Sequence, residues 1–143
     1  MRFWLIPAFI LVTSAAHADH ELEGRDIGSG RVLYAEQCAS CHGANLQGQP
    51  DWRASGDDGV FPAPPHDRTG HTWHHDNMLL FSYTRLGGQE ALAERGIMGF
   101  NSGMPGFADI MTDEQIWDTL AYIRSTWPEN MQDIQASANQ PHD

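Results

Sequence analysis

The sequence contains no lysine, so its eight basic residues are all arginine, and they stand against 19 acidic residues for a formal net charge of −11. Nucleic acids and anionic lipid surfaces attract proteins through basic patches, which this sequence has few residues to build. We therefore expect neither as a partner. The excess of negative charge favours solubility, and it also complements a basic docking surface on another protein.

Long apolar runs are also scarce. The marked one, FWLIPAFILV at residues 3–12, follows Arg2 and precedes the small-residue site AHA at 16–18. This order predicts a secretory signal peptide over residues 1–18, cleaved to leave a mature chain that begins near Asp19. The run is too short to cross a bilayer core of roughly 30 Å, although an uncleaved membrane anchor is the alternative. We expect export to the periplasm without stable membrane insertion.

Runs of alternating β-branched residues and internal repeats are absent, which argues against a sheet and against a solenoid. A chain of 143 residues suffices for one domain with a modest core around a cofactor. We predict an all-α fold with a short lead at 19–28, one domain at 29–128 and a polar C-terminal tail at 129–143 that frays.

Three segments show the apolar spacing of helices. The first follows Ser29 as N-cap, and the second spans Asp76–Leu86. The third begins at Thr112, and Gln115 three residues later predicts a capping box. Its apolar stripe comprises Ile116, Leu120, Ile123 and Trp127. Residues 43–71 are rich in Gly, Pro and Asp and predict a long loop, which in a small domain is typically functional or wrapped round something.

The chain has only two cysteines, Cys38 and Cys41, and His42 directly follows the second. A zinc site would need two further ligands, and the remaining histidines lie farther along the chain than in small zinc modules. A redox dithiol would need a βαβ context, and a disulfide explains neither His42 nor the long loop. Cys-x-x-Cys-His at the end of a helix is typical of c-type haem attachment, with both cysteines as thioethers and His42 as proximal iron ligand.

The iron of such a haem takes a second axial ligand or leaves that position open. Met104 lies in NSGMPGF, a Gly/Pro-rich segment before the last helix, from which a thioether can approach iron opposite His42. Met98 in GIMGF is the rival. Methionine raises the reduction potential relative to a second histidine, and filling both positions suits electron transfer rather than gas or peroxide chemistry.

The segments GRVLYAEQCASCHG and GMPGFADIMTDEQIWDTLAYIRSTWP resemble the class I cytochromes c of bacterial periplasms. The resemblance implies that the cysteine-bearing helix crosses the last helix and that a Met-Pro loop closes one covalent haem c. It puts Gly30 and Tyr34 against Leu120 and Tyr122 at the crossing. The implied function is that of a monomeric mono-haem carrier of single electrons between redox partner proteins, not an enzyme in its own right, although a role as haem subunit of an oxidoreductase is compatible with it.

The middle segment VFPAPPHDRTGHTWHHDN resembles the family only loosely. It contains His66, His71, His74 and His75. We expect these histidines to line the haem edge or to face solvent; the alternative is a copper site, in a metal-handling or redox-sensing protein. Arg68 and Trp73 are candidates to donate hydrogen bonds to the haem propionates. Pro64 or Pro65 is a candidate to accept one from His42 Nδ1, which would fix the histidine tautomer.

Overall fold

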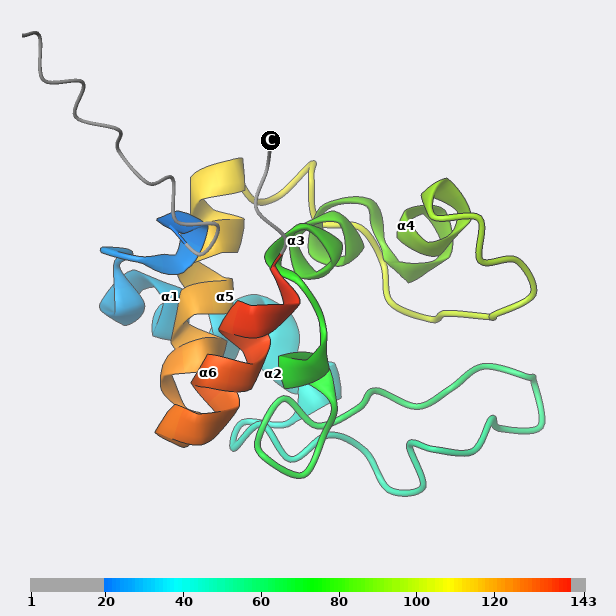
Figure 1. Ribbon diagram of the computed structural model, residues 1–143. Coiled ribbons are helices and arrows are strands. Elements are labelled where there is room, and N and C mark those ends of the chain that lie inside the picture. The colour runs from blue at the N-terminus through cyan, green and yellow to red at the C-terminus, as the bar shows by residue number, and fades with distance from the viewer. Residues whose placement is uncertain (1–19, 140–143) are drawn as a thin grey trace, which may run out of the picture.

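The computed structural model describes residues 20–139 and is helical (Figure 1). The elements in chain order are η1 (His20–Leu22), α1 (Ile27–Leu33), η2 (Tyr34–Cys38), α2 (Ala39–His42), η3 (Thr72–His74), α3 (Asn77–Leu86), α4 (Gly88–Glu94), α5 (Asp113–Ser125) and α6 (Glu129–Ala138). The predicted all-α class is confirmed. No helix within residues 20–139 has the length and apolar content to cross a membrane. The predicted signal peptide, residues 1–18, lies outside the described residues.

α1, η2 and α2 follow one another without a break and form the cysteine-bearing helix. It begins earlier than predicted, because Asp26 rather than Ser29 is the N-cap and accepts a hydrogen bond from the Ser29 N–H at 2.9 Å. η2 has π-helical geometry. This geometry is rare in proteins overall, but where it occurs it is often at a functional site. The segment ends at Gly43, whose φ of +83° favours glycine.

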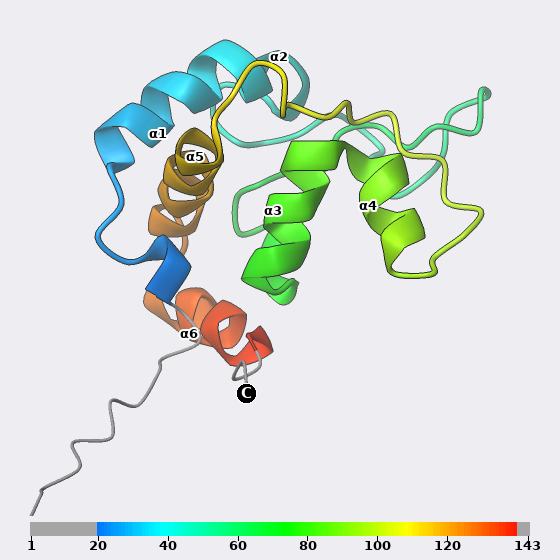
Figure 2. The same cartoon turned by 90° about the horizontal axis from the view of Figure 1, so that it is seen from above.

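α1 crosses α5, and Gly30 lies at the point of contact (Figures 1 and 2). A Cβ at Gly30 would stand 2.0 Å from the Asp118 carbonyl oxygen, so the two backbones approach this closely only with glycine. One turn later the Tyr34 ring packs on Tyr122, with centroids 5.6 Å apart. The predicted crossing is confirmed, with Leu120 in the same buried core as Tyr34.

α5 starts as the sequence predicts. The Thr112 hydroxyl accepts a hydrogen bond from the Gln115 N–H at 3.3 Å, and the Gln115 side chain accepts one from the Thr112 N–H at 2.9 Å. This capping box satisfies two backbone donors that a helix start leaves free. The apolar stripe is buried in the core, namely Ile116, Leu120, Ile123 and Trp127.

α3 also agrees with its prediction, since the Asp76 side chain accepts a hydrogen bond from the Leu79 N–H at 2.7 Å and caps the helix. α4 was not predicted. It begins directly after Gly87, whose φ of +88° turns the chain out of α3. Periodicity did not reveal α4 because it has only 7 residues, of which Ala91 is the buried apolar one.

The expectation that the chain frays from Glu129 is wrong, because α6 packs back onto η3. Gln135 is fully buried, and its Nε2 donates to Asn77 Oδ1 at 2.6 Å and to the His75 carbonyl at 3.3 Å. Arg124 Nε donates to Gln135 Oε1 at 3.1 Å. Paired polar groups thus hold α6 on the side of the domain opposite α2 (Figure 2).

Candidate functional site

A cavity of about 1040 Å³ lies beside the cysteine-bearing helix and is bounded by residues of α3, α5 and the two long loops. Its walls are largely apolar and include Leu79, Leu80, Phe107, Leu120 and Ile123. The volume is at the upper end of the roughly 300–1,000 Å³ typical of ligand and cofactor sites. The cavity therefore has room for a bulky, mostly apolar ligand or cofactor.

The two cysteines line this cavity, Cys38 buried and Cys41 exposed. They stand three residues apart on a helical segment, a spacing that puts side chains on one face. They do not form a disulfide with each other. Burial, with a smaller contribution from Cys41, raises the pKa of the Cys38 thiol to about 11. The site thus presents two cysteine sulfurs on one wall of the cavity.

His42 is buried at the end of α2 and lines the same cavity. Its Nδ1 lies 2.8 Å from the Pro64 carbonyl oxygen, as expected for this proline. A carbonyl can only accept, so Nδ1 carries the proton and Nε2 keeps its lone pair for a metal. Burial lowers the pKa of His42 below its usual value, and the hydrogen bond with Pro64 acts in the opposite direction.

The long loop brings Pro64 to His42 because it turns back tightly. Gly48 donates its N–H to the His42 carbonyl at 2.7 Å and has a φ of +67°. A Cβ at Gly48 would stand 2.4 Å from Pro65 N, so only glycine fits where the chain at residue 48 passes the chain at residue 65. Residues 43–71 contain no helix, which confirms the predicted loop.

Met104 lines the cavity from the loop that precedes α5. This loop is tied to the α3–α4 junction, where the Gly88 N–H donates to the Met104 carbonyl at 3.1 Å. The Met104 N–H donates to Ser102 Oγ at 3.3 Å, and Ser102 Oγ lies 2.8 Å from the Tyr83 hydroxyl. The unpredicted α4 therefore helps to hold Met104. Met98, the predicted rival, is 77% exposed and does not line the cavity.

The four histidines of the middle segment do not form a metal cluster. Within residues 20–139, no group of three or more His, Cys, Asp or Glu side chains is arranged to hold a metal ion. His66, His71 and His75 line the cavity, whereas His74 stacks on Trp73 with centroids 3.7 Å apart. Burial lowers the pKa of His71 and of His75, which favours their neutral forms.

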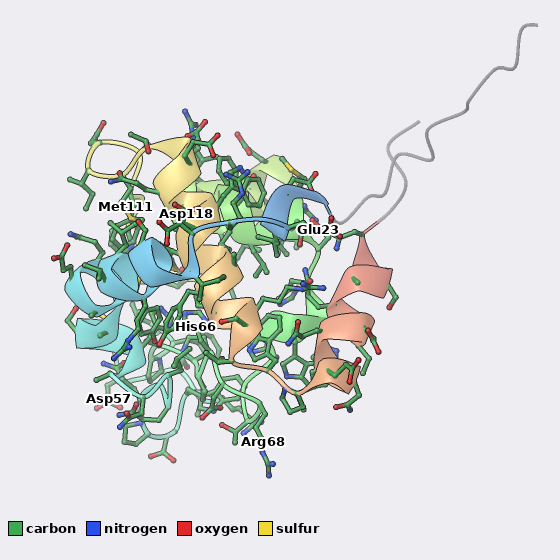
Figure 3. The ribbon with its side chains drawn as sticks, turned by 90° about the vertical axis from the view of Figure 1, so that its left-hand side faces the viewer. Glu23, Asp57, His66, Arg68, Met111 and Asp118 are labelled. Atoms are coloured by element: carbon green, nitrogen blue, oxygen red, sulfur yellow. The ribbon has the colours of Figure 1, made fainter. Side chains whose placement is uncertain are left out.

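Neither of the predicted propionate donors lines the cavity. Arg68 is exposed and points away from the domain (Figure 3). Trp73 packs on the core and on His74, and within the described residues its buried Nε1 has no hydrogen-bond partner. The expectation for Arg68 is corrected, because its side chain points away from the domain. The assignment of Trp73 stays a prediction, since its buried Nε1 still has a proton to donate.

Trp52 and Arg53 line the cavity instead, and sequence reasoning missed them. The Arg53 guanidinium carbon lies 4.0 Å from the Trp52 ring centroid. Trp52 stacks on His71, with centroids 5.2 Å apart and planes at 8°. An aromatic residue and an arginine in a Gly/Asp-rich loop are a weak signal for such a role, and no periodicity indicates which way they face.

The donor set suits a covalently bound haem. Two thiols, an imidazole with a free Nε2 and a thioether line one largely apolar cavity, and Arg53 supplies a cation for carboxylates. Thiols are the groups that bond to haem vinyl groups, and imidazole and thioether are ligands that haem iron takes.

A family model described as Cytochrome c matches residues 27–127, well over half of the chain. Comparison with curated protein sequences and with solved structures gives no match. The matched region begins at the first residue of α1 and ends at Trp127, so α6 follows it.

Proposed function

Since the chain belongs to the cytochrome c family of haem-binding electron-transfer proteins, we propose that it is a periplasmic mono-haem cytochrome that carries single electrons. Iron in this proposal is ligated by His42 and Met104. The observation that carries the proposal is that both residues line one cavity together with the two thiols. The only two cysteines, Cys38 and Cys41, supply one attachment site and so favour a single haem.

When bound, haem supplies a one-electron iron couple, and the protein determines its position and potential. Cys38 and Cys41 would hold it through thioethers. The Pro64 carbonyl, 2.8 Å from His42 Nδ1, fixes the imidazole tautomer and makes it a stronger donor. The thioether of Met104 raises the reduction potential relative to a nitrogen ligand. The apolar walls limit the access of water.

Arg53 and His71 are the side chains that we assign to the haem carboxylates in place of Arg68. Both line the cavity, and each of them packs on the Trp52 ring. An arginine fork suits a carboxylate because it donates two hydrogen bonds in one plane.

The copper-handling alternative has less support, because the described histidines form no three-ligand group. A redox titration of the purified protein should give one reversible one-electron transition. Carbon monoxide should bind the ferrous protein poorly, since Met104 occupies the position it needs. Addition of Cu(II) should leave both the potential and the haem spectrum unchanged. A saturable shift on adding Cu(II) would favour the alternative, and tight carbon monoxide binding would indicate an open iron.

The salt dependence of electron transfer should reveal the partner's charge. Cleavage before Asp19 removes Arg2 and no acidic residue, so the mature chain has a net charge of −12. Attraction to a basic partner is screened by salt, and the Debye length falls from roughly 30 to 7 Å between about 10 and 200 mM. We expect the bimolecular rate with the physiological partner to fall over this range in stopped-flow measurements.

A flat salt profile would instead indicate docking through an apolar surface. Ile97, which lines the cavity and is 49% exposed, belongs to such a surface. A rate that increases with salt would contradict attraction and indicate an acidic partner.

A further inference from the structure

His66 packs face to face on His42. The two ring centroids lie 4.0 Å apart with planes at 28°. Pro64 contacts the edge of the same His42 ring through Nδ1. The His42 imidazole is thus restrained on one edge by a hydrogen bond and on one face by a second aromatic ring. Stacked rings stabilise each other by more than the burial of their surface area contributes.

His66 is itself held at its backbone and its ring. Its N–H donates to the Leu46 carbonyl at 2.8 Å, and its own carbonyl accepts from Trp127 Nε1 at 2.7 Å. The ring Nδ1 lies 2.9 Å from Thr72 Oγ1, and the Tyr34 ring meets it edge-on at 6.1 Å. Figure 3 shows His66 inside the domain, close to α5. Turning the ring would break its contacts with Thr72 on one side and with Tyr34 and His42 of the cysteine-bearing helix on the other.

Haem attachment does not account for this arrangement. His66 lines the cavity, yet the thiols, His42 and Met104 already supply the attachment and axial groups. A leucine would fill similar space without a flat face or a polar anchor. The histidine has a flat ring whose orientation is held by Thr72, and the His42 ring packs on this flat face.

We propose that His66 is a positioning residue that fixes the rotation of the His42 imidazole about its bond to iron, and thereby tunes the electronic state and potential of the haem. This inference rests on the proposed ligation of iron by His42. The ring plane of an axial imidazole decides which iron orbitals it overlaps, and groups around a ligand are known to orient it and to tune the metal.

Proton NMR of the ferric holoprotein tests this, because the hyperfine shifts of the haem methyl groups report the orientation of the axial ligand plane. His66→Leu should change the order or spread of these shifts and move the reduction potential. His66→Phe keeps a stacking ring and should remain nearer the wild-type pattern. Thr72→Val keeps the His66 ring but removes its Nδ1 anchor, together with the 3.5 Å hydrogen bond that the Thr72 hydroxyl donates to the Pro65 carbonyl, and should produce a smaller change in the direction of His66→Leu.

His74→Ala is the matched control, since it removes a histidine that stacks on Trp73 and does not line the cavity. It should leave shifts and potential unchanged. If His66→Leu does not fold, judged by thermal unfolding, the Thr72→Val comparison decides. If a folded His66→Leu has the shifts and the potential of the wild type, the inference is wrong, while the proposed function stands. If His66→Leu does not fold, the same result in Thr72→Val has the same meaning. A wild-type protein whose iron lacks His42 would overturn the proposed function as well.

Discussion

Replacing both cysteines, Cys38→Ser with Cys41→Ser, should abolish retention of haem by the denatured chain. A thioether needs a thiol to add to a vinyl group, and the serine hydroxyl at the same position does not form this bond. Each single variant should keep one thioether and so retain part of the haem at reduced yield. Haem staining after denaturing electrophoresis, and extraction with acidified acetone, measure the retention.

Ser40→Ala is the control for this experiment, because Ser40 lies between the cysteines and lines the cavity without supplying a thiol. It should retain haem as the wild type does. Haem that can be extracted from the wild-type protein, with two titratable thiols left on the chain, would contradict covalent attachment.

Replacing Met104 with alanine should abolish the weak sulfur-to-iron charge-transfer band at the far-red end of the ferric spectrum. The potential should fall by on the order of 0.1 V or more, within the roughly 0.8 V range over which axial ligands set haem potentials. The reason is that a thioether stabilises ferrous iron relative to water or a nitrogen ligand. Optical spectroscopy and a redox titration of the same sample give both quantities.

Met98→Ala is the matched control, since Met98 is 77% exposed and lies earlier in the same loop between α4 and α5. It should keep both the band and the potential. Survival of the band in Met104→Ala, together with its loss in Met98→Ala, would show that the distal ligand has been assigned to the wrong methionine.

Features encoded by short local patterns were predictable from the sequence. The Thr112–Gln115 capping box fixed the start of α5, and the apolar stripe after it identified the buried face. The cysteines and His42 were found through their adjacency in the chain. Met104 was identified by its Gly/Pro-rich setting, because a loop of that kind can present one side chain to a cavity.

Features that depend on distant contacts were not predictable. α6 is rich in polar residues and resembles a tail, and what holds it is pairing between buried polar groups such as Gln135 and Asn77. Hydrophobic periodicity does not detect such pairing. The extra turn at the start of α1 depends on Asp26, a cap that precedes the apolar pattern.

The cavity lining shows the same division. Side chains of an irregular loop have no periodicity, so the tertiary fold alone turns Trp52 and Arg53 inward and Arg68 outward. The stacking of His66 on His42 is also invisible in the sequence, because 24 positions separate two residues that meet only when the loop folds back.

The intact mass of the purified protein under denaturing conditions, after treatment with a thiol-alkylating reagent, is the most direct test of the haem site. The expected result is the mass of the chain from about Asp19 plus one haem, with no alkyl group on Cys38 or Cys41. The mass of the polypeptide alone, with both thiols alkylated, would show that the cavity beside His42 does not hold a covalent haem.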